Sequence, residues 1–154
     1  MKYEEFKTAE EYLDWMFLSN LGTDSLVKKD ELKKIAEFYD IEFKDNATKE
    51  ELYKLVLPKI TYRGMIREFN AGVSSYEYKH KFNITGDEVK RMERLGFITV
   101  SGHQTFRAYG RTLKANVYDV YEFYSLTHEI VQDFLRLNPK GTRKNNVKFV
   151  NKEI

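Results

Sequence analysis

Residues 72–100, GVSSYEYKHKFNITGDEVKRMERLGFITV, contain two helix starts of the same kind. The two pairs are Ser74 with Glu77 and Thr85 with Glu88. In such a capping box the hydroxyl accepts a hydrogen bond from the third helical amide, and the carboxylate accepts one from the amide of the capping residue. The short segment FNI links the two helices, and Gly96 is a typical stop after the second. The stretch therefore predicts a short helix, a tight link and a second helix over residues 86–95.

The residues that follow favour a β-hairpin and a closing helix. Residues 97–100 suit a strand, the Ser101–Gly102 dipeptide supplies a turn, and residues 103–109 return as the partner strand. Residues 116–137, NVYDVYEFYSLTHEIVQDFLRL, then predict one long helix with an apolar inward face. Helix, turn, helix, hairpin, helix is the order of a winged helix-turn-helix domain, which we expect over residues 73–137.

The first 72 residues indicate further helices. Two more capping boxes are formed by Thr8 with Glu11 and by Thr48 with Glu51. Between them, Leu32, Ile35, Ala36 and Tyr39 have the spacing of a short amphipathic helix, and Ile41 and Phe43 alternate as in an extended connector. The stretch ITYRGMIREFNAG, residues 60–72, predicts another helix that stops at its glycine.

Charge is distributed unevenly along the 154 residues. Residues 1–60 hold 10 Lys, no Arg and 14 acids, a net charge of −4, whereas residues 61–154 hold 16 basic and 10 acidic residues, a net charge of +6. Residues 94–118 contain no acid at all, and residues 136–152 carry six positive charges. Arginine offers a planar fork of donors suited to phosphates and guanine edges. We therefore expect an acidic N-terminal half, a basic C-terminal half, and a basic, mobile tail over residues 138–154.

The segment LVKKDELKKIAEFYDIEFKDNATKEELYKLVLPKI resembles the SAP family of small DNA-binding modules and the related Rho N-terminal-like modules over about 35 residues. The resemblance implies nucleic-acid contacts from basic residues near the first helix and the loop. The lysines in comparable places are Lys28, Lys29, Lys33, Lys34 and Lys49. Residues 24–60 hold 8 lysines against 9 acids, and the loop lacks the family's usual glycine, so a structural or protein-docking role is equally open.

A second resemblance covers about 60 residues, 74–128. The segments DEVKRMERLGFI and YDVYEFYSL, with an arginine-bearing hairpin between them, resemble the small winged domains of the excisionase and MerR-like class. That class reads DNA with its second helix and lays the wing along an adjacent groove. Carried over to this chain, the DNA-contacting residues are Lys90, Arg91 and Arg94 on the helix over residues 86–95, and Gln104, Arg107, Arg111 and Lys114 on a wing over residues 97–116.

Catalytic and metal-binding patterns are not evident in the sequence. The chain has no cysteine, so disulfides and thiolate metal sites are excluded. The histidines, His80, His103 and His128, lack the i, i+4 partner of a helical metal site, and no phosphate loop, nucleophile elbow or Asp-x-Asp cluster occurs. No apolar run approaches the ~20 residues of a membrane span, and no signal peptide opens the chain. We expect a soluble, cytoplasmic protein that is not an enzyme and uses no cofactor.

The expected fold is mainly α: an acidic helical module over residues 1–72 that contains the SAP-like segment, followed by the winged helix-turn-helix with one short hairpin. The leading hypothesis is a DNA-binding regulator or replication accessory factor that contacts duplex DNA. The abundance of Tyr, Phe, Lys and Asn resembles AT-rich genomes, including those of many phages, and favours a phage or mobile-element origin. One alternative is a protein-interaction module, such as a phage inhibitor of a host protein, which could use the acidic half. RNA binding is the third hypothesis.

Overall fold

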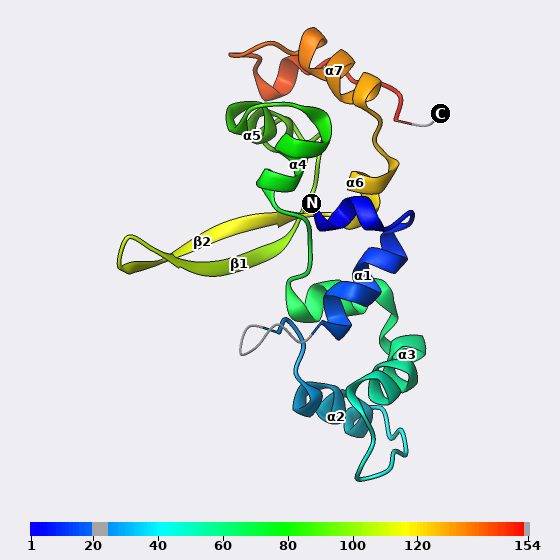
Figure 1. The fold of residues 1–154 in the computed structure, drawn as a ribbon. Helices are drawn as coiled ribbons and strands as arrows, with labels where there is room; N and C mark the ends of the chain where they lie inside the picture. The colour runs from blue at the N-terminus through cyan, green and yellow to red at the C-terminus, as the bar shows by residue number, and fades with distance from the viewer. Residues whose placement is uncertain (20–24, 153–154) are drawn as a thin grey trace. The chain divides into compact units, whose positions relative to one another are not determined.

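The computed structural model describes residues 1–19 and 25–152, and these form two compact units (Figure 1). The helical unit consists of Phe6–Ala71. The hairpin unit consists of Met1–Glu5 together with the chain from Gly72 onward. As the sequence predicts, the described chain is mainly helical and contains one two-stranded antiparallel sheet. The first five residues, expected in the N-terminal module, belong instead with the second unit.

The helical unit contains α1 (Ala9–Leu18), α2 (Lys29–Phe38) and α3 (Lys49–Phe69). The expected caps are present, since Thr8 Oγ1 accepts from the Glu11 amide at 3.2 Å and Thr48 Oγ1 accepts from the Glu51 amide at 3.1 Å. Leu32 and Ala36 of α2 and Leu52 and Val56 of α3 are fully buried where the two helices pack together. The segment between α2 and α3 is non-helical and contains turns, and the expected SAP-like arrangement stays a prediction.

Helix α3 combines two helices that the sequence predicts separately. Its backbone breaks at Thr61, where φ is 69° and ψ is 165°. Pro58 lies three residues earlier, and a proline inside a helix removes one backbone donor and clashes with the preceding turn. Thr61 Oγ1 then accepts from the Gly64 amide at 3.2 Å, so the threonine caps the second half of α3.

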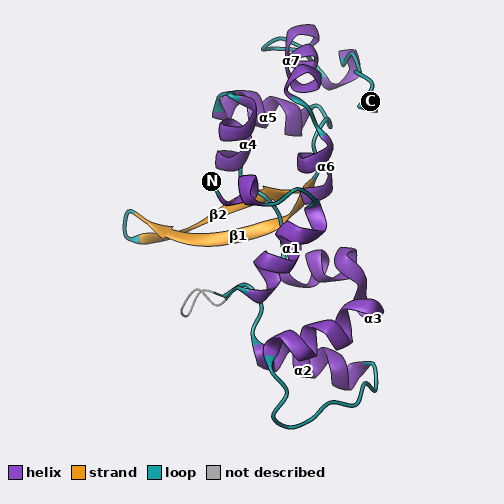
Figure 2. Ribbon diagram, turned by 45° about the vertical axis from the view of Figure 1, so that its right-hand side comes forward, coloured by secondary structure: helices purple, strands orange, loops and turns teal. Residues whose placement is uncertain are grey.

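The hairpin unit contains every described strand of the protein (Figure 2). Its elements are η1 (Lys2–Glu5), α4 (Ser75–Phe82), α5 (Gly86–Arg94), β1 (Val100–Ala108), β2 (Arg111–Tyr118), α6 (Val120–Ser125), α7 (His128–Leu137) and η3 (Lys144–Asn146). Both capping boxes close in both directions, with the Glu77 and Glu88 carboxylates accepting from the capping amides at 3.0 and 2.9 Å. The helix–link–helix prediction for α4 and α5 is therefore confirmed.

The core of the hairpin unit is aromatic. Phe97, just after α5, stacks on Phe134 of α7 with ring centroids 3.9 Å apart and planes 7° apart. Tyr78 and Phe82 of α4 pack edge-on against Phe123 of α6, with centroid distances of 5.0 and 6.0 Å. These side chains are fully buried, so α4, α6 and α7 are held together by apolar burial rather than by exposed charge pairs.

The hairpin turn lies eight residues later than the sequence predicts. Ser101 and Gly102 are part of β1, where a register shift between Val100 and Gly102 marks a bulge. The turn is formed by Tyr109 and Gly110, whose φ values of 54° and 75° are both positive. Two positive φ values define the tight turn whose twist matches that of paired strands. The prediction was wrong because tyrosine is an unusual residue for this conformation.

The predicted closing helix is also corrected, because residues 116–118 extend β2 and the remainder forms two helices. Thr127 has an extended backbone and accepts from the Ile130 amide at 3.2 Å, so it caps α7 and ends the run of α6. Asp119 caps α6 in the same way, accepting from the Glu122 amide at 3.1 Å. The apolar spacing that indicated one long helix continues through α6 and α7. The polar cap at Thr127 separates the two helices.

Residues 138–152, expected to form a mobile tail, fold back on the hairpin unit. Asn138 is fully buried: its Nδ2 donates to the carbonyls of Phe134 and Lys148 at 3.0 and 2.7 Å, and its Oδ1 accepts from the Lys148 amide at 2.8 Å. Lys152 donates to the Phe97 carbonyl and pairs with Glu122 at 3.4 Å. The satisfied side-chain amide of Asn138 holds residue 148 beside residue 138, and the Lys152 contacts hold the end of the segment.

The first residues of the chain are held by the same unit. The Tyr3 hydroxyl shares a hydrogen bond of 2.6 Å with Nδ1 of His80, and the Tyr124 hydroxyl donates to the Tyr3 carbonyl at 2.7 Å. The Tyr3 ring also meets Phe123 edge-on at 5.0 Å. Tyr3 therefore anchors η1 on α4 and α6.

Gly72 opens the hairpin unit in a place with no room for a side chain. A Cβ atom there would lie 2.5 Å from Ser101 Oγ and 2.7 Å from the Tyr118 carbonyl oxygen. We expect Gly72→Ala to lower the free energy of unfolding of this unit by about 2 kcal/mol, since overpacking against backbone is not relieved by rotamer changes. Amide hydrogen exchange of β2 measures the effect. Gly86→Ala is the matched control, because its nearest neighbour is 3.9 Å away, and we expect no loss there.

Candidate nucleic-acid interface

Helix α5 carries the three cations predicted to contact DNA. Val89 and Met92 are fully buried and fix the face of the helix that packs on its unit. Lys90 and Arg94 lie four residues apart and are exposed, and Arg91 is half-buried beside them. Residues four apart lie on the same face of a helix, so the amphipathic pattern alone aligns these charges.

A concavity of about 1000 Å³ adjoins this face of α5. It is lined by four segments: the start of α4 at Ser75, α5, residues 114–118 of β2, and the loop at residues 140–141. Its basic side chains are Lys90, Arg91, Arg94, Lys114 and Lys140. The structure thus brings together four of the seven predicted residues, whereas Gln104, Arg107 and Arg111 do not line the concavity.

Two of the arginines are held by the C-terminal segment. Arg91 Nη1 donates to the Asn138 carbonyl at 3.3 Å, and Arg94 Nη1 donates to the Thr142 carbonyl at 2.9 Å. A carbonyl carries no net charge, so these bonds orient the guanidinium groups without neutralising them. Each guanidinium has five N–H donors, and most of them remain available to a ligand.

Two acids, Asp87 and Glu93, also line the concavity, and Glu93 has a structural role. Glu93 Oε1 accepts from the Tyr118 hydroxyl at 2.7 Å and from Asn116 Nδ2 at 3.0 Å. Burial, followed by the hydrogen bond to Glu93, raises the pKa of Tyr118. The carboxylate is therefore satisfied by β2, and it joins that strand to α5. Asp87 lies in the first turn of α5, where a negative charge complements the helix dipole.

The hairpin presents two chemically different faces, because paired residues of an antiparallel ladder share a face and successive residues alternate. One face has the pairs His103–Asn116, Thr105–Lys114 and Arg107–Thr112. We call it the polar face. The other has the pairs Gln104–Ala115, Phe106–Leu113 and Ala108–Arg111. We call it the apolar face. The four predicted hairpin residues are therefore split, with Arg107 and Lys114 on the polar face and Gln104 and Arg111 on the apolar face.

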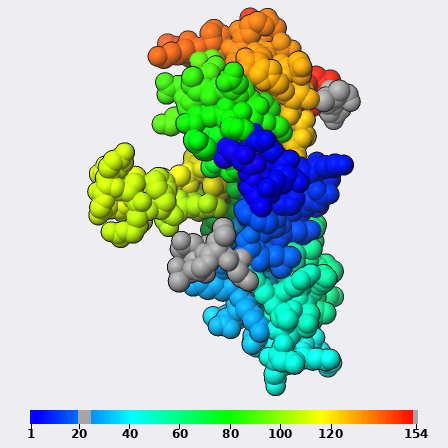
Figure 3. Space-filling view, viewed as in Figure 1, coloured from blue at the N-terminus to red at the C-terminus, as the bar shows by residue number. Residues whose placement is uncertain are grey.

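The polar face is continuous with the α5 surface. Asn116 and Tyr118, which contact Glu93, lie two and four residues after Lys114 and on the same side of β2. Figure 3 shows the hairpin, in yellow-green, standing away from the helices of its unit. Arg107 and Lys114 thus extend the basic surface of α5 outward along one side of the hairpin.

Lys140 is the basic residue of the concavity that sequence reasoning missed. It was assigned to a mobile tail, and the bonds that place its loop beside α5 come from residues far apart in the chain. The excess of basic residues over 136–152 was the available signal, but it carried no information on position.

Among the described residues, no three His, Cys, Asp or Glu side chains form a group that could hold a metal ion. In the same ranges, no helix has the combined length and hydropathy needed to cross a membrane. Comparison of the chain with protein-family models, curated proteins and solved structures finds no match.

Removal of the hydroxyl group should have opposite effects on the free energy of unfolding at two tyrosines of this unit, Tyr118 and Tyr78. Tyr118→Phe removes the bond to the Glu93 carboxylate and should lower the free energy of unfolding by about 2 kcal/mol. The fully buried Tyr78 hydroxyl has no hydrogen-bond partner within the described chain, so Tyr78→Phe should raise that free energy by about 1 kcal/mol. Denaturant unfolding of the two variants provides the comparison. Equal losses in both would show that Tyr78 has a partner in solution.

Proposed function

We propose that the protein is a non-enzymatic DNA-binding protein that contacts duplex DNA through α5 and the polar face of the hairpin. The observation that carries the proposal is the concavity beside α5, where five basic side chains from three separate segments converge. The net charge of the hairpin unit supports it: this unit holds 15 basic and 11 acidic residues, a charge of +4, whereas the helical unit has 11 and 13, a charge of −2.

The physical basis is the release of counterions from the phosphate backbone. Each phosphate that Lys or Arg neutralises adds a favourable, salt-dependent term to binding. In this proposal α5 is the second helix of a helix-turn-helix and enters the major groove, which accommodates one α-helix. The hairpin serves as a wing along the adjacent backbone, with Arg107 and Lys114 directed at phosphates. Lys140, which also lines the concavity, adds a further contact.

The proposed biological role rests on the basic side chains of the site, which suit phosphate contacts. A chain that binds DNA without acting on it suits a regulator or a replication accessory factor, and its residue usage favours a phage or mobile element. In this proposal the SAP-like segment of the helical unit contributes little to DNA affinity, since its lysines are balanced by acids.

The two faces of the hairpin make the proposal testable by salt titration. We expect Arg107→Ala with Lys114→Ala to weaken binding to random duplex by at least roughly tenfold, and to reduce the slope of log affinity against log salt by about two. Arg111→Ala, on the apolar face, should change the slope by less than about one. Fluorescence anisotropy at several salt concentrations measures both.

The control for this experiment is Arg136→Ala, which removes an exposed arginine of α7 that is paired with Asp133 at 3.3 Å and does not line the concavity. Its affinity and salt slope should match those of the unsubstituted protein. If the polar-face variant folds normally and binds duplex with unchanged affinity and slope, the hairpin is not part of a DNA site and the proposed interface is wrong.

An exposed aromatic pair favours a second candidate function, self-association through the helical unit. Phe38 and Tyr39 are 80% and 40% exposed, and they border a groove of about 510 Å³ with Ile35, Ile60 and Phe69. The occupant we propose is the hairpin of a second copy, whose apolar face carries Phe106 and Leu113 and whose unit has the opposite net charge.

Sedimentation velocity tests this second candidate. We expect a dimer at low salt that dissociates at high salt, because the attraction between units of opposite charge is screened. Phe38→Ser should abolish the dimer, whereas Leu55→Ser, at another exposed apolar position of the helical unit, should leave it intact. A protein that remains monomeric at every salt concentration rules out self-association.

A further inference from the structure

The tip of the hairpin carries an aromatic side chain that does not help the protein to fold. Tyr109 is 95% exposed, the highest value among the large apolar side chains of the described chain. It also has a φ of 54°, a left-handed conformation that costs a bulky residue about 1 kcal/mol or more. The tight turn accounts for the positive φ but not for a bulky aromatic residue that buries no surface there, which points to a contact outside the protein.

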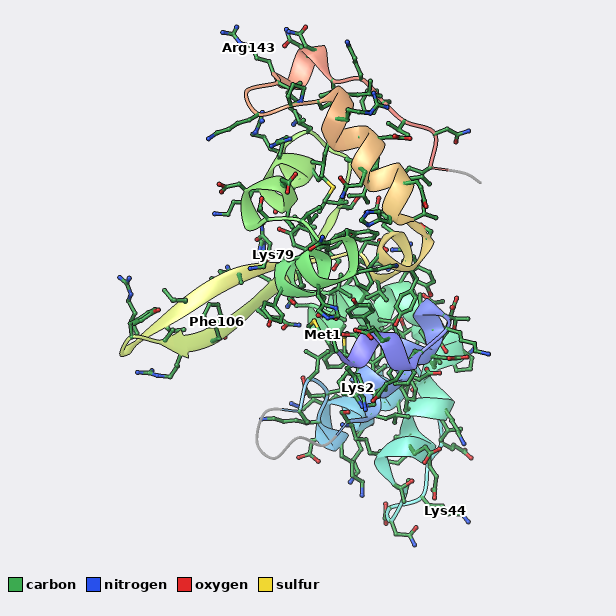
Figure 4. All side chains as sticks on the ribbon, turned by 45° about the horizontal axis from the view of Figure 1, so that its top comes forward. Met1, Lys2, Lys44, Lys79, Phe106 and Arg143 are labelled. Carbon is green, nitrogen blue, oxygen red and sulfur yellow. The ribbon has the colours of Figure 1, made fainter. Side chains whose placement is uncertain are left out.

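The surroundings of Tyr109 define the chemistry of what it contacts. Arg107 lies on the polar face and Arg111 on the apolar face, so an exposed arginine lies two residues before Tyr109 and another two residues after it. Phe106, 49% exposed, adds a second aromatic ring just behind the tip (Figure 4). No acid occurs in residues 94–118. A ligand for this tip must be a polyanion that also offers flat apolar surfaces, and nucleotides with accessible bases have both properties.

Fully paired duplex does not meet this requirement. Its bases are stacked on one another and present only their edges in the grooves, so a tyrosine ring has no base face to contact. An unpaired nucleotide presents its whole face, and aromatic side chains between cations are the usual platforms for it. The aromatic tip and the duplex-binding surface of α5 therefore favour two different regions of one nucleic acid.

The length of the hairpin allows both regions to be bound at once. Strand β1 has 9 residues, and at ~3.3 Å per residue its tip lies roughly 27 Å from its base. That distance corresponds to about eight base-pair steps of duplex at ~3.4 Å each. The tip therefore projects beyond the concavity beside α5, whose β2 lining begins at Lys114.

We infer that Tyr109 stacks on an unpaired base next to duplex DNA, and that the substrate is therefore a duplex with a single-stranded extension. The inference rests on the proposed function, because α5 and the polar face must hold the duplex. The tip contributes selectivity for the junction, and the basic surface contributes affinity for the backbone.

The test uses Tyr109→Asn, because asparagine accepts a positive φ and Asn-Gly is a preferred sequence for this turn. The variant removes the ring while keeping or improving the hairpin. Tyr109→Phe retains the ring, and Tyr76→Asn removes another exposed tyrosine of the same unit, 64% exposed on α4. Anisotropy titrations of the full chain compare a blunt duplex, the same duplex with a single-stranded extension, and vesicles containing anionic phospholipid.

We expect the unsubstituted protein to prefer the extended duplex over the blunt one by at least about fivefold. Tyr109→Asn should remove this preference and leave blunt-duplex binding unchanged, while Tyr109→Phe and Tyr76→Asn should both retain the preference. A fluorescent adenine analogue at the first unpaired position should be quenched by the unsubstituted protein and by Tyr109→Phe, but not by Tyr109→Asn.

The remaining outcomes separate this inference from the proposed function. Equal binding of blunt and extended duplex, unaffected by Tyr109→Asn, overturns the role of the tip and leaves the duplex proposal in place. Failure to bind either DNA overturns both. Binding to anionic vesicles that is lost in Tyr109→Asn, without any preference for the extended duplex, would assign the aromatic tip to a membrane surface and overturn the inference.

Discussion

The candidate interface depends on one carboxylate, Glu93, which joins α5 to β2. Its Oε1 accepts hydrogen bonds from two side chains spaced two residues apart on one side of the strand, Asn116 and Tyr118. A partly buried carboxylate that loses its hydrogen-bond donors raises the free energy of the folded protein. The bonds to Glu93 therefore hold α5 and the hairpin in one arrangement. The same contact decides which face of the hairpin continues the surface of α5, and thereby which cations can act together.

The features that could be predicted from the sequence are those encoded locally. Four hydroxyl caps fix the starts of helices, because each one satisfies amides within its own first turn. Lys90, Arg91 and Arg94 were named by the resemblance to winged domains, and all three lie on α5 beside the concavity. The hairpin turn was misplaced because Ser101–Gly102 has better local turn chemistry than Tyr109–Gly110, and strand pairing over eight to nine residues overrode that preference.

The features that could not be predicted depend on contacts between distant residues. Asn138 is one residue in a polar stretch of sequence, and only its bonds to Lys148 and Phe134 show that the segment folds back. That fold places Lys140 in the concavity and holds Arg91 and Arg94 by backbone carbonyls. Side chains already fixed in the free protein lose less conformational entropy when a ligand binds. The C-terminal segment was expected to be a mobile tail. It instead preorganises the basic surface of α5.

The anchoring of Tyr3 on His80 across 77 residues of chain has a topological consequence. Residues 1–5 and the chain from residue 72 form one unit, so all of Phe6–Ala71 is, for that unit, an insertion between its first and second elements. The entropy of closing such a loop grows only with the logarithm of its length, and doubling the loop costs about 0.6 kcal/mol. An insertion of this kind can be exchanged for one of different length or fold with little penalty to its host. An N-terminal truncation, by contrast, removes Tyr3 together with the insertion and leaves the aromatic core of the host without its first element.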